Sequence, residues 1–493
     1  MIFPSIAIDS PVNSLSPLES LLSLDRAYPT PSIIGLLQKS ENEDLLQYIV
    51  EDPFGSHVFP GNIRSYEVSR FLEDANEELS EKKPFHFWIN FPLCEKRCAF
   101  CQYAIVAGGS KSERIKSLSK QWIEAIMREA ELWLAALPNL NDAPVGEFNL
   151  FGGTPSLIPR EEMGRLMDFL YKHFNFTGDS TLRIEGNADS FSRERLLFLK
   201  KMGFSKVSIG IQSFDDEVLK LCNVSHTGEQ AIDFIKMAQD LGFDRINGDL
   251  IYGLLNQTVA SVEKDMELTV DLRLYSLDCS KLHLKDYKET GTGIAGNIPA
   301  AWQKEGWRFK EEKKGRHWPA LGEQLQMREI INDTLTANGY REHPTMYFSK
   351  EGYGPERWKS MMVDQDKQCV EIAMGLGGSS SCEKSEAHVT VEPDSYLKQV
   401  EKGQLPLHSA RGFNQQGKLV RAIRMALSTC QALSDKVHRE RWTTSSLFDS
   451  YWLPKFESLR ERGFVKIDKK EKTIELTHEG KIIVEAIMHR EIY

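Results

Sequence analysis

Between residues 86 and 281 the chain alternates short apolar segments with longer amphipathic ones. The short segments are typical of β-strands, and the apolar residues of the longer ones recur every three to four positions, as in helices. The six expected strands are 86–91, 147–151, 181–185, 206–212, 245–251 and 274–281. The expected helices are 112–136, 160–173, 192–202, 228–241 and 258–271. Successive β–α units indicate a parallel sheet, so we expect an α/β chain with an open (β/α)6 partial barrel.

The chain is long enough for more than one compact unit, since 493 residues exceed an average domain. In the N-terminal part we expect an amphipathic helix over 65–81. The C-terminal part predicts a winged-helix-like α+β domain with helices at 417–430, 444–462 and 479–489 and a β-hairpin within 464–477. The expected units are an N-terminal extension 1–82, the barrel core 83–300, a connecting segment 301–385 and the C-terminal domain 386–493.

Three cysteines stand close together directly after the first expected strand. Cys94, Cys98 and Cys101 have the spacing C-x3-C-x2-C. Three thiolates in one loop can hold three irons of a cubane 4Fe–4S cluster, because soft sulfur ligands suit iron–sulfur chemistry. The loop holds no fourth cysteine, so the fourth iron would stay open for a small ligand. A zinc site is the alternative, but it needs four ligands, and His57 and His86 stand at no recognised spacing.

This loop resembles the signature of the radical SAM superfamily, CxxxCxφC, in which the aromatic φ is Phe100 here. The resemblance implies that the open iron binds the amino and carboxylate groups of S-adenosylmethionine (SAM). It also implies that one electron from the cluster cleaves SAM and releases a 5′-deoxyadenosyl radical. We count Phe100, and Trp88 on the preceding strand, among the expected SAM contacts.

Further expected SAM contacts follow the later strands. Gly152, Gly153 and Thr154 form a GGTP-type turn, whose adjacent glycines we expect to expose backbone N–H groups; an ordinary turn is the alternative. By resemblance this turn binds the methionine amino group of SAM, and Glu185 grips the same end of the cofactor. The remaining expected contacts are Gln212, in the small-residue pattern S-x-G-x-Q, and Asp249, a charge inside an apolar strand with a plausible ribose-binding role.

These elements together resemble one subgroup of the superfamily, the oxygen-independent coproporphyrinogen III oxidase-like proteins. The run 247–257, with sequence NGDLIYGLLNQ, is similar to that subgroup's DLIYGLPxQ motif. Residues 374–380 resemble its later glycine-rich turn, and 415–493 resemble its small C-terminal domain. The resemblance extends from about residue 86 to the C-terminus.

The chain also departs from the oxidases of this subgroup. Trp88 and Asn90 stand where the oxidases have Tyr and His, Gln102 and Tyr103 stand where they have a further cysteine, and Val224 precedes Ser-His where an arginine is usual. We therefore favour a methyltransferase or cyclopropanase that forms C–C bonds with a second SAM. An oxidase-like decarboxylase and an anaerobic haem-degrading methyltransferase are the enzymatic alternatives, and a haem-binding chaperone is the non-enzymatic one.

Three residues are candidates for contact with an organic substrate. Tyr103 could stack on a planar group, although it could equally pack in the core. His283 follows the sixth strand, and His343 lies in a segment that faces the active site in the subgroup. For His283 we favour a packing or surface role over contact with substrate.

Charge and cysteine usage limit the other functional classes. A net charge of −10 does not favour a nucleic-acid surface, and no apolar run approaches the ~20 residues of a membrane span. Only three of the 8 cysteines cluster, which fits a reduced cytoplasmic setting rather than a disulfide framework. The expected partners are a small organic substrate and an electron donor such as a flavodoxin or ferredoxin.

Overall fold

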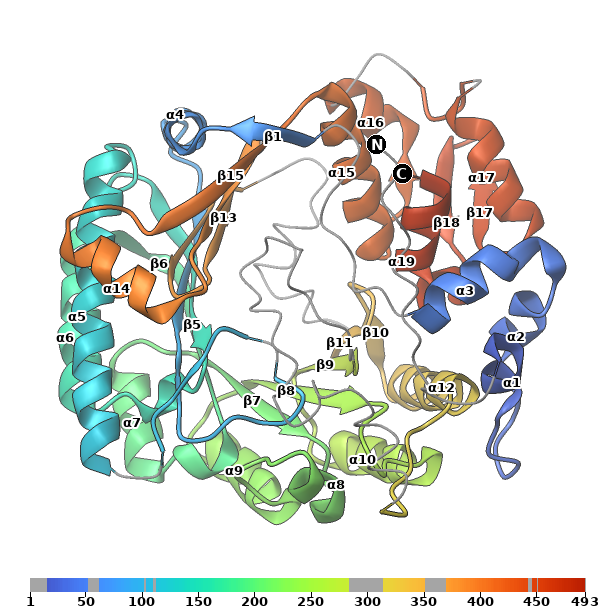
Figure 1. Ribbon diagram of the computed structural model, residues 1–493, viewed down its shortest axis with the longest axis horizontal. Helices are drawn as coiled ribbons and strands as arrows, with labels where there is room; N and C mark the ends of the chain where they lie inside the picture. Colours follow the sequence, from blue (N-terminus) through green and yellow to red (C-terminus); the bar gives the residue numbers. More distant parts are fainter. Residues whose placement is uncertain are drawn as a thin grey trace.

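The six expected strands lie side by side as one parallel array in the computed structural model (Figure 1). It describes residues 16–51, 62–101, 103–109, 112–282, 314–350, 369–441, 446–449 and 451–492. The parallel strands, in spatial order, are β2 (Phe85–Phe91), β5 (Pro144–Gly152), β6 (Asn175–Gly186), β7 (Lys206–Gln212), β8 (Arg245–Tyr252) and β9 (Ser276–Lys281). The prediction of a (β/α)6 core is confirmed.

Helices cover the outer face of this array (Figure 1). They are α5 (Ser112–Ala136), α6 (Arg160–His173), α7 (Arg193–Lys201), α8 (Asp216–Leu221), α9 (Gly228–Asp240) and α10 (Val259–Asp271). Leu166 and Leu170 of α6 are fully buried with Phe148 and Leu150 of β5 in one core cluster. Their spacing of four residues on the helix and two on the strand is the pattern from which both elements were predicted.

The sheet continues beyond the six parallel strands, which the sequence did not reveal. Its described strands form a 13-stranded mixed sheet. Beyond β2 lie β12 (Glu371–Gly375), β13 (Ser379–Ser381), β14 (Ser385–Val389), β15 (Leu407–Phe413) and β1 (Asn62–Tyr66), and beyond β9 lie β11 (Tyr347–Lys350) and β10 (Tyr340–Glu342). β12 runs parallel to β2, and the other added strands pair antiparallel. Except for β15, these added strands have three to five residues, too few for a clear alternation.

A second core joins the two ends of the chain. The N-terminal helices α1 (Pro17–Leu22), α2 (Ser32–Leu37) and α3 (Glu43–Glu51) share it with α12 (Leu321–Ala337), α15 (Gln415–Ser428), α17 (Trp452–Glu461) and the hairpin of β17 (Val465–Asp468) and β18 (Thr473–Leu476). Figure 1 shows the blue and red ends of the chain side by side. The chain therefore closes on itself, with the barrel between its two ends.

Several expected helix boundaries are wrong. The helix expected over 65–81 is α4 (Val68–Leu79), because residues 62–66 pair with β15 instead. The stretch 446–449 is not helical, and α17 starts only at Trp452. The last expected helix is interrupted at Ile483, and α18 (His478–Ile482) and α19 (Val484–Ile487) flank the break. The chain from 435 to 441 forms a further helix, α16 (Asp435–Arg441), which we did not predict.

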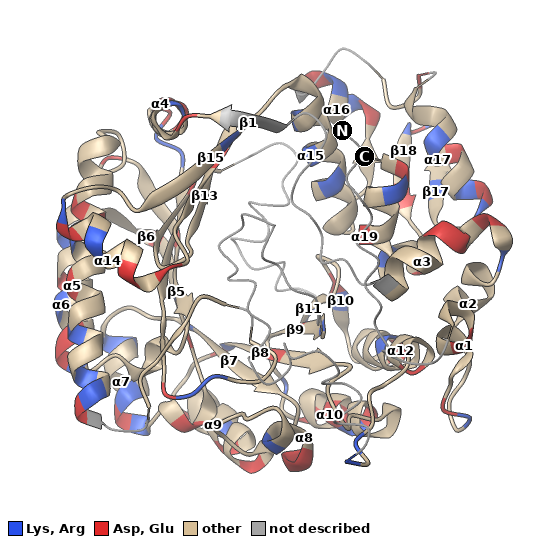
Figure 2. Cartoon of the chain, in the orientation of Figure 1, with Lys and Arg blue, Asp and Glu red and all other residues tan. Residues whose placement is uncertain are grey.

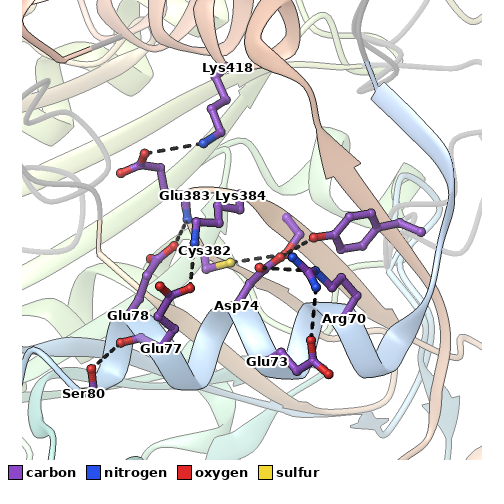
Figure 3. Close-up of polar contacts among 12 residues, drawn as sticks. Arg70, Glu73, Asp74, Glu77, Glu78, Ser80, Cys382, Glu383, Lys384 and Lys418 are labelled. Atoms are coloured by element: carbon purple, nitrogen blue, oxygen red, sulfur yellow. Dashed lines mark hydrogen bonds and ion pairs between the residues drawn. The ribbon is translucent and has the colours of Figure 1, made fainter.

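Helix α4 fastens the N-terminal part to the turn between β13 and β14 (Figure 3). Ser385 Oγ donates a hydrogen bond to Asp74 Oδ2 (2.8 Å), and the Glu383 amide donates to Glu78 Oε1 (2.8 Å). Asp74 is 3% exposed, so this anchor is shielded from water. The antiparallel part of the sheet is thereby held against the parallel barrel.

Charged side chains lie mainly on the outer helices. Figure 2 shows both signs of charge on α16 and α17, so these C-terminal helices present no stripe of one sign. Within the described ranges, no helix has both the length and the apolar character that crossing a membrane requires.

Candidate active site

The residues singled out from the sequence gather at one end of the barrel. The cysteine loop follows β2, the Gly152–Gly153 turn ends β5, Glu185 lies at the end of β6, Gln212 ends β7, and Asp249 lies on β8. Because these strands are parallel, their carboxyl ends meet at the same edge of the sheet. Strand order alone therefore places the thiols beside the acidic residues.

The three thiols are close neighbours in a well-anchored loop. The Gly108 amide donates to Cys94 O (2.7 Å), and the Ala99 amide donates to Cys222 O (2.8 Å). Burial, together with the neighbouring Cys101 and Cys94 thiolates, raises the pKa of Cys98 to about 12. Thr154 Oγ1 lies 3.4 Å from Cys94 Sγ and donates a hydrogen bond to it. Three soft sulfur ligands in one loop have the chemistry of an iron–sulfur donor set, but within the described residues the thiols do not converge into a group that could hold a metal ion.

Close contacts within the protein explain why glycines stand at the end of β5. Gly152 has φ +113°, and a Cβ there would overlap Asn90 Oδ1. A Cβ on Gly153 would lie 2.7 Å from Leu93 O. The amides of Gly153 and Thr154 donate to Phe91 O (2.7 Å) and Leu93 O (2.8 Å). The expectation that this turn exposes free N–H groups is therefore wrong for these two amides, which hold the turn against the cysteine loop.

The acidic residues belong to a hydrogen-bonded network. Arg183 Nη2 lies 3.2 Å from Glu185 Oε1 and donates to Ser208 Oγ (2.8 Å). Ser208 Oγ donates to Asp249 Oδ2 (3.3 Å), and Asn247 Nδ2 donates to Asp249 Oδ1 (2.6 Å). The side chain of Glu185 is still 30% exposed, so its carboxylate can reach a ligand. The sequence did not indicate that Arg183 and Ser208 connect the two carboxylates.

Tyr103 lies at the mouth of this site. Desolvation raises its pKa well above the usual value, and the Glu185 carboxylate, Cys101, Asp278 and Asp249 raise it further. Tyr103 is therefore close enough to these carboxylates to interact with them electrostatically, and the residue as a whole is 48% exposed. Asp278 on β9 is a further acidic neighbour that we did not predict.

Three other expected contacts line the same end of the barrel. Trp88 packs edge-on against Phe151, with ring centroids 4.9 Å apart. Phe100 is half-buried in a small apolar cluster beneath the loop. Gln212 has φ +67° at an irregularity in the β7–β8 pairing, and its Nε2 lies 2.5 Å from where a Cβ on Gly210 would be. The glycine of S-x-G-x-Q therefore makes room for the Gln212 side chain.

Of the two candidate histidines only His343 is described, and it is not part of this arrangement. His283 lies outside the described residues. His343 follows β10, the last strand of the sheet, and the adjacent Thr345 amide donates to Ser428 O of α15 (2.9 Å). Burial and the nearby Arg341 lower the pKa of His343. No contact in the described chain joins His343 to the carboxylates of β6 and β8.

Comparison with known proteins gives consistent matches. The family model described as "Radical SAM superfamily" matches residues 89–269. The "Heme chaperone HemW" of Bacillus subtilis is 23% identical over 403 residues, which cover 80% of this chain and 96% of that protein. The oxygen-independent coproporphyrinogen III oxidase of Helicobacter pylori is 24% identical over 467 residues, covering 89% and 95%. The solved structure of the Escherichia coli coproporphyrinogen III oxidase has a TM-score of 0.73 at 20% identity, covering 91% and 98%, and shows the fold.

Proposed function

Because the chain belongs to the radical SAM superfamily, in its oxygen-independent coproporphyrinogen III oxidase-like subgroup, we propose that it is a radical SAM enzyme acting on a carboxylated tetrapyrrole. The observation that carries the proposal is the position of three thiols and two carboxylates at one end of a parallel barrel. Family membership implies a 4Fe–4S cluster and SAM.

Each part of the site has a proposed task. Cys94, Cys98 and Cys101 would hold three irons, with Thr154 hydrogen-bonded to Cys94. Glu185 would bind the amino end of SAM, and Asp249, oriented by its hydrogen bond from Asn247, would bind the ribose.

Trp88, Phe100, Gln212, Gly152 and Gly153 would shape the space around the cofactor. When bound, the cluster and SAM supply a 5′-deoxyadenosyl radical that removes a hydrogen atom from the substrate. An electron donor of the flavodoxin or ferredoxin kind would supply the electron.

The oxidase-like activity now ranks above methyl transfer. The relatives that align over most of the chain are named as coproporphyrinogen oxidases and a haem chaperone, so they favour the alternative over the methyltransferase or cyclopropanase that we preferred from the sequence. Asn90, which stands in place of the oxidases' histidine, donates its amide to Leu376 O and packs against Gly152. Its role is thus structural, and the departure at this position does not by itself indicate another reaction.

A haem-binding chaperone is the second candidate. The observation that favours it is the alignment with 96% of the Bacillus subtilis haem chaperone. Such a protein would bind haem and need not turn over any substrate.

One anaerobic assay separates these functions. The cluster is reconstituted, and SAM, dithionite, coproporphyrinogen III and a one-electron acceptor are added. Mass spectrometry then measures 5′-deoxyadenosine, S-adenosylhomocysteine and the vinyl product of decarboxylation. We expect 5′-deoxyadenosine and the vinyl product. S-adenosylhomocysteine together with 5′-deoxyadenosine, and without the vinyl product, would support methyl transfer from a second SAM. If the cluster is verified spectroscopically, neither nucleoside product forms and haem binds tightly, the protein is a haem-binding chaperone rather than an enzyme.

A matched pair of cysteine variants controls the assay. Cys98→Ala should abolish SAM cleavage. Cys222 is a fully buried cysteine in the same apolar cluster but outside the C-x3-C-x2-C loop, so Cys222→Ala should retain SAM cleavage. Loss of cleavage in both variants would indicate damage to the loop rather than loss of a ligand.

A further inference from the structure

The interior of the barrel carries a chain of hydrogen bonds across four neighbouring strands. Arg183 Nη2 on β6 donates to Ser208 Oγ on β7 (2.8 Å), and Asn247 Nδ2 on β8 donates to the same oxygen (3.0 Å). Ser276 Oγ on β9 donates to Asn247 Oδ1 (2.8 Å). Buried polar groups in proteins are normally paired in this way. The side-chain polar groups of Ser208, Asn247 and Ser276 are therefore paired within the protein.

Asn149 on the adjacent strand β5 is different. It is 1% exposed, and neither its Oδ1 nor its Nδ2 has a hydrogen-bond partner in the described chain. Along the sheet it lies between Trp88 of β2 and Arg183 of β6. Its sequence neighbours Phe148 and Leu150 belong to the core beneath the helices, so the Asn149 side chain points to the opposite face, into the barrel. It is a buried amide beside this hydrogen-bonded row, and it takes no part in it.

The position of Asn149 relates it to the proposed active site. It stands three residues before the Gly152 turn, on the same face of β5 as Phe151, whose ring contacts Trp88. A buried amide without partners is costly, because it has lost its bonds to water and gained none in return. A leucine of similar size would avoid that cost. The amide is therefore best explained by a partner that is not part of the chain.

We propose that Asn149 is a substrate-recognition residue that accepts a hydrogen bond from an N–H group and donates one to a carboxylate or carbonyl oxygen of the same substrate. This inference rests on the proposed function, because it places the substrate inside the barrel below SAM. A porphyrinogen offers both groups, since it has pyrrole N–H donors and propionate oxygens. Haem offers no pyrrole N–H, because iron occupies its four nitrogens.

The first test is thermal unfolding of the reconstituted protein. Asn149→Leu removes an amide without partners, so its Tm should equal or exceed that of the wild type. Asn247→Leu is the matched control: Asn247 is also 1% exposed, but its amide is bonded to Ser208, Asp249 and Ser276, and its loss should lower the Tm. An Asn149→Leu Tm as low as that of Asn247→Leu would show a structural role and overturn the inference.

The second test is equilibrium binding, which requires no SAM cleavage. The probe is coproporphyrin III, a free-base porphyrin with central N–H groups and propionates, titrated anaerobically and followed by fluorescence. Asn149→Leu should weaken its binding by about tenfold or more, as expected for two lost hydrogen bonds. The affinity for haem should fall less.

Equal affinities of the wild type and Asn149→Leu for coproporphyrin III, or no binding by the wild type, would overturn the inference. Formation of 5′-deoxyadenosine by the wild type, measured separately, reports on the proposed function alone. The two proposals can therefore fail independently.

Discussion

Glu129 of α5 is a buried carboxylate whose titration should be visible in the stability of the whole protein. It is fully buried and accepts hydrogen bonds from Tyr396 Oη (2.6 Å), the Gly375 amide (2.8 Å) and Trp133 Nε1 (3.2 Å). The next residue after Gly375 supplies the carbonyl that holds Asn90 against the Gly152 turn. Glu129 thus supports the active-site end of β12 from behind.

Burial raises the pKa of Glu129 from 4.5 to about 7, although its three hydrogen-bond donors oppose the rise. The folded protein then holds a proton that the unfolded chain releases above pH 4.5. This proton's contribution to stability is complete below pH 4.5 and is lost as the pH rises through 7. A shift of this size corresponds to about 3 kcal/mol.

The measurement compares the wild type with Glu129→Gln, which cannot titrate. The variant should be less stable at pH 5.5 because Gln cannot accept all three hydrogen bonds, at a cost of roughly 1–3 kcal/mol. The difference in Tm between the two proteins should shrink, or change sign, by pH 8. Glu124→Gln, at an exposed position of the same helix, is the control and should show no such trend. A wild-type advantage that is constant or grows with pH would refute the reasoning.

Three further predictions concern the stability of the site and its surroundings. Gly152→Ala should lower both Tm and SAM affinity, because a Cβ at this positive φ would overlap Asn90. Gly164→Ala is the control: it has open space around it in the middle of α6, and it should raise the free energy of unfolding in denaturant by about 1 kcal/mol. Lys206→Met should lower the free energy of unfolding by roughly 3–5 kcal/mol, because it leaves the fully buried Glu147 carboxylate, 3.2 Å away, without its cation. A Lys206→Met/Glu147→Leu double variant should recover most of this loss. No recovery would contradict the ion-pair explanation. Burial lowers the pKa of His438 to about 4, so the wild type should lose stability relative to His438→Leu as the pH falls from 7 towards 4, and a Tm difference independent of pH would contradict this.

The elements of the parallel barrel could be predicted because their signals are local. Helices 112–136 and 160–173 and strand 206–212 were predicted with their observed limits, since each has a clear periodicity within its own residues. The strands β10 to β14 escaped prediction because they are short and are stabilised by pairing with distant partners, as in the pairing of Glu371 with His86. A strand of three residues carries no periodicity of its own.

The candidate site also contains features that the sequence reveals and features that only the pairing of strands reveals. The cysteine spacing and the GGTP turn are contiguous in sequence, so the residues themselves indicate the superfamily. The need for a glycine at position 152, by contrast, arises from the close approach of Asn90 on another strand. Likewise, Glu185 and Asp249 are connected by hydrogen bonds through Arg183 and Ser208. Such lateral contacts depend on strand order and register, which no stretch of sequence specifies alone.

The sequence by itself therefore determined the barrel, the three-cysteine loop and the acidic residues at the strand ends, because each depends on near neighbours along the chain. Only the tertiary structure decided which polar groups are satisfied by the protein. Asn149 and Asn247 are both asparagines within strands, and nothing in their flanking residues distinguishes them. The neighbouring strands give Asn247 three partners and Asn149 none. The free energy of a buried amide depends on what faces it across the sheet, and that is set when the strands assemble.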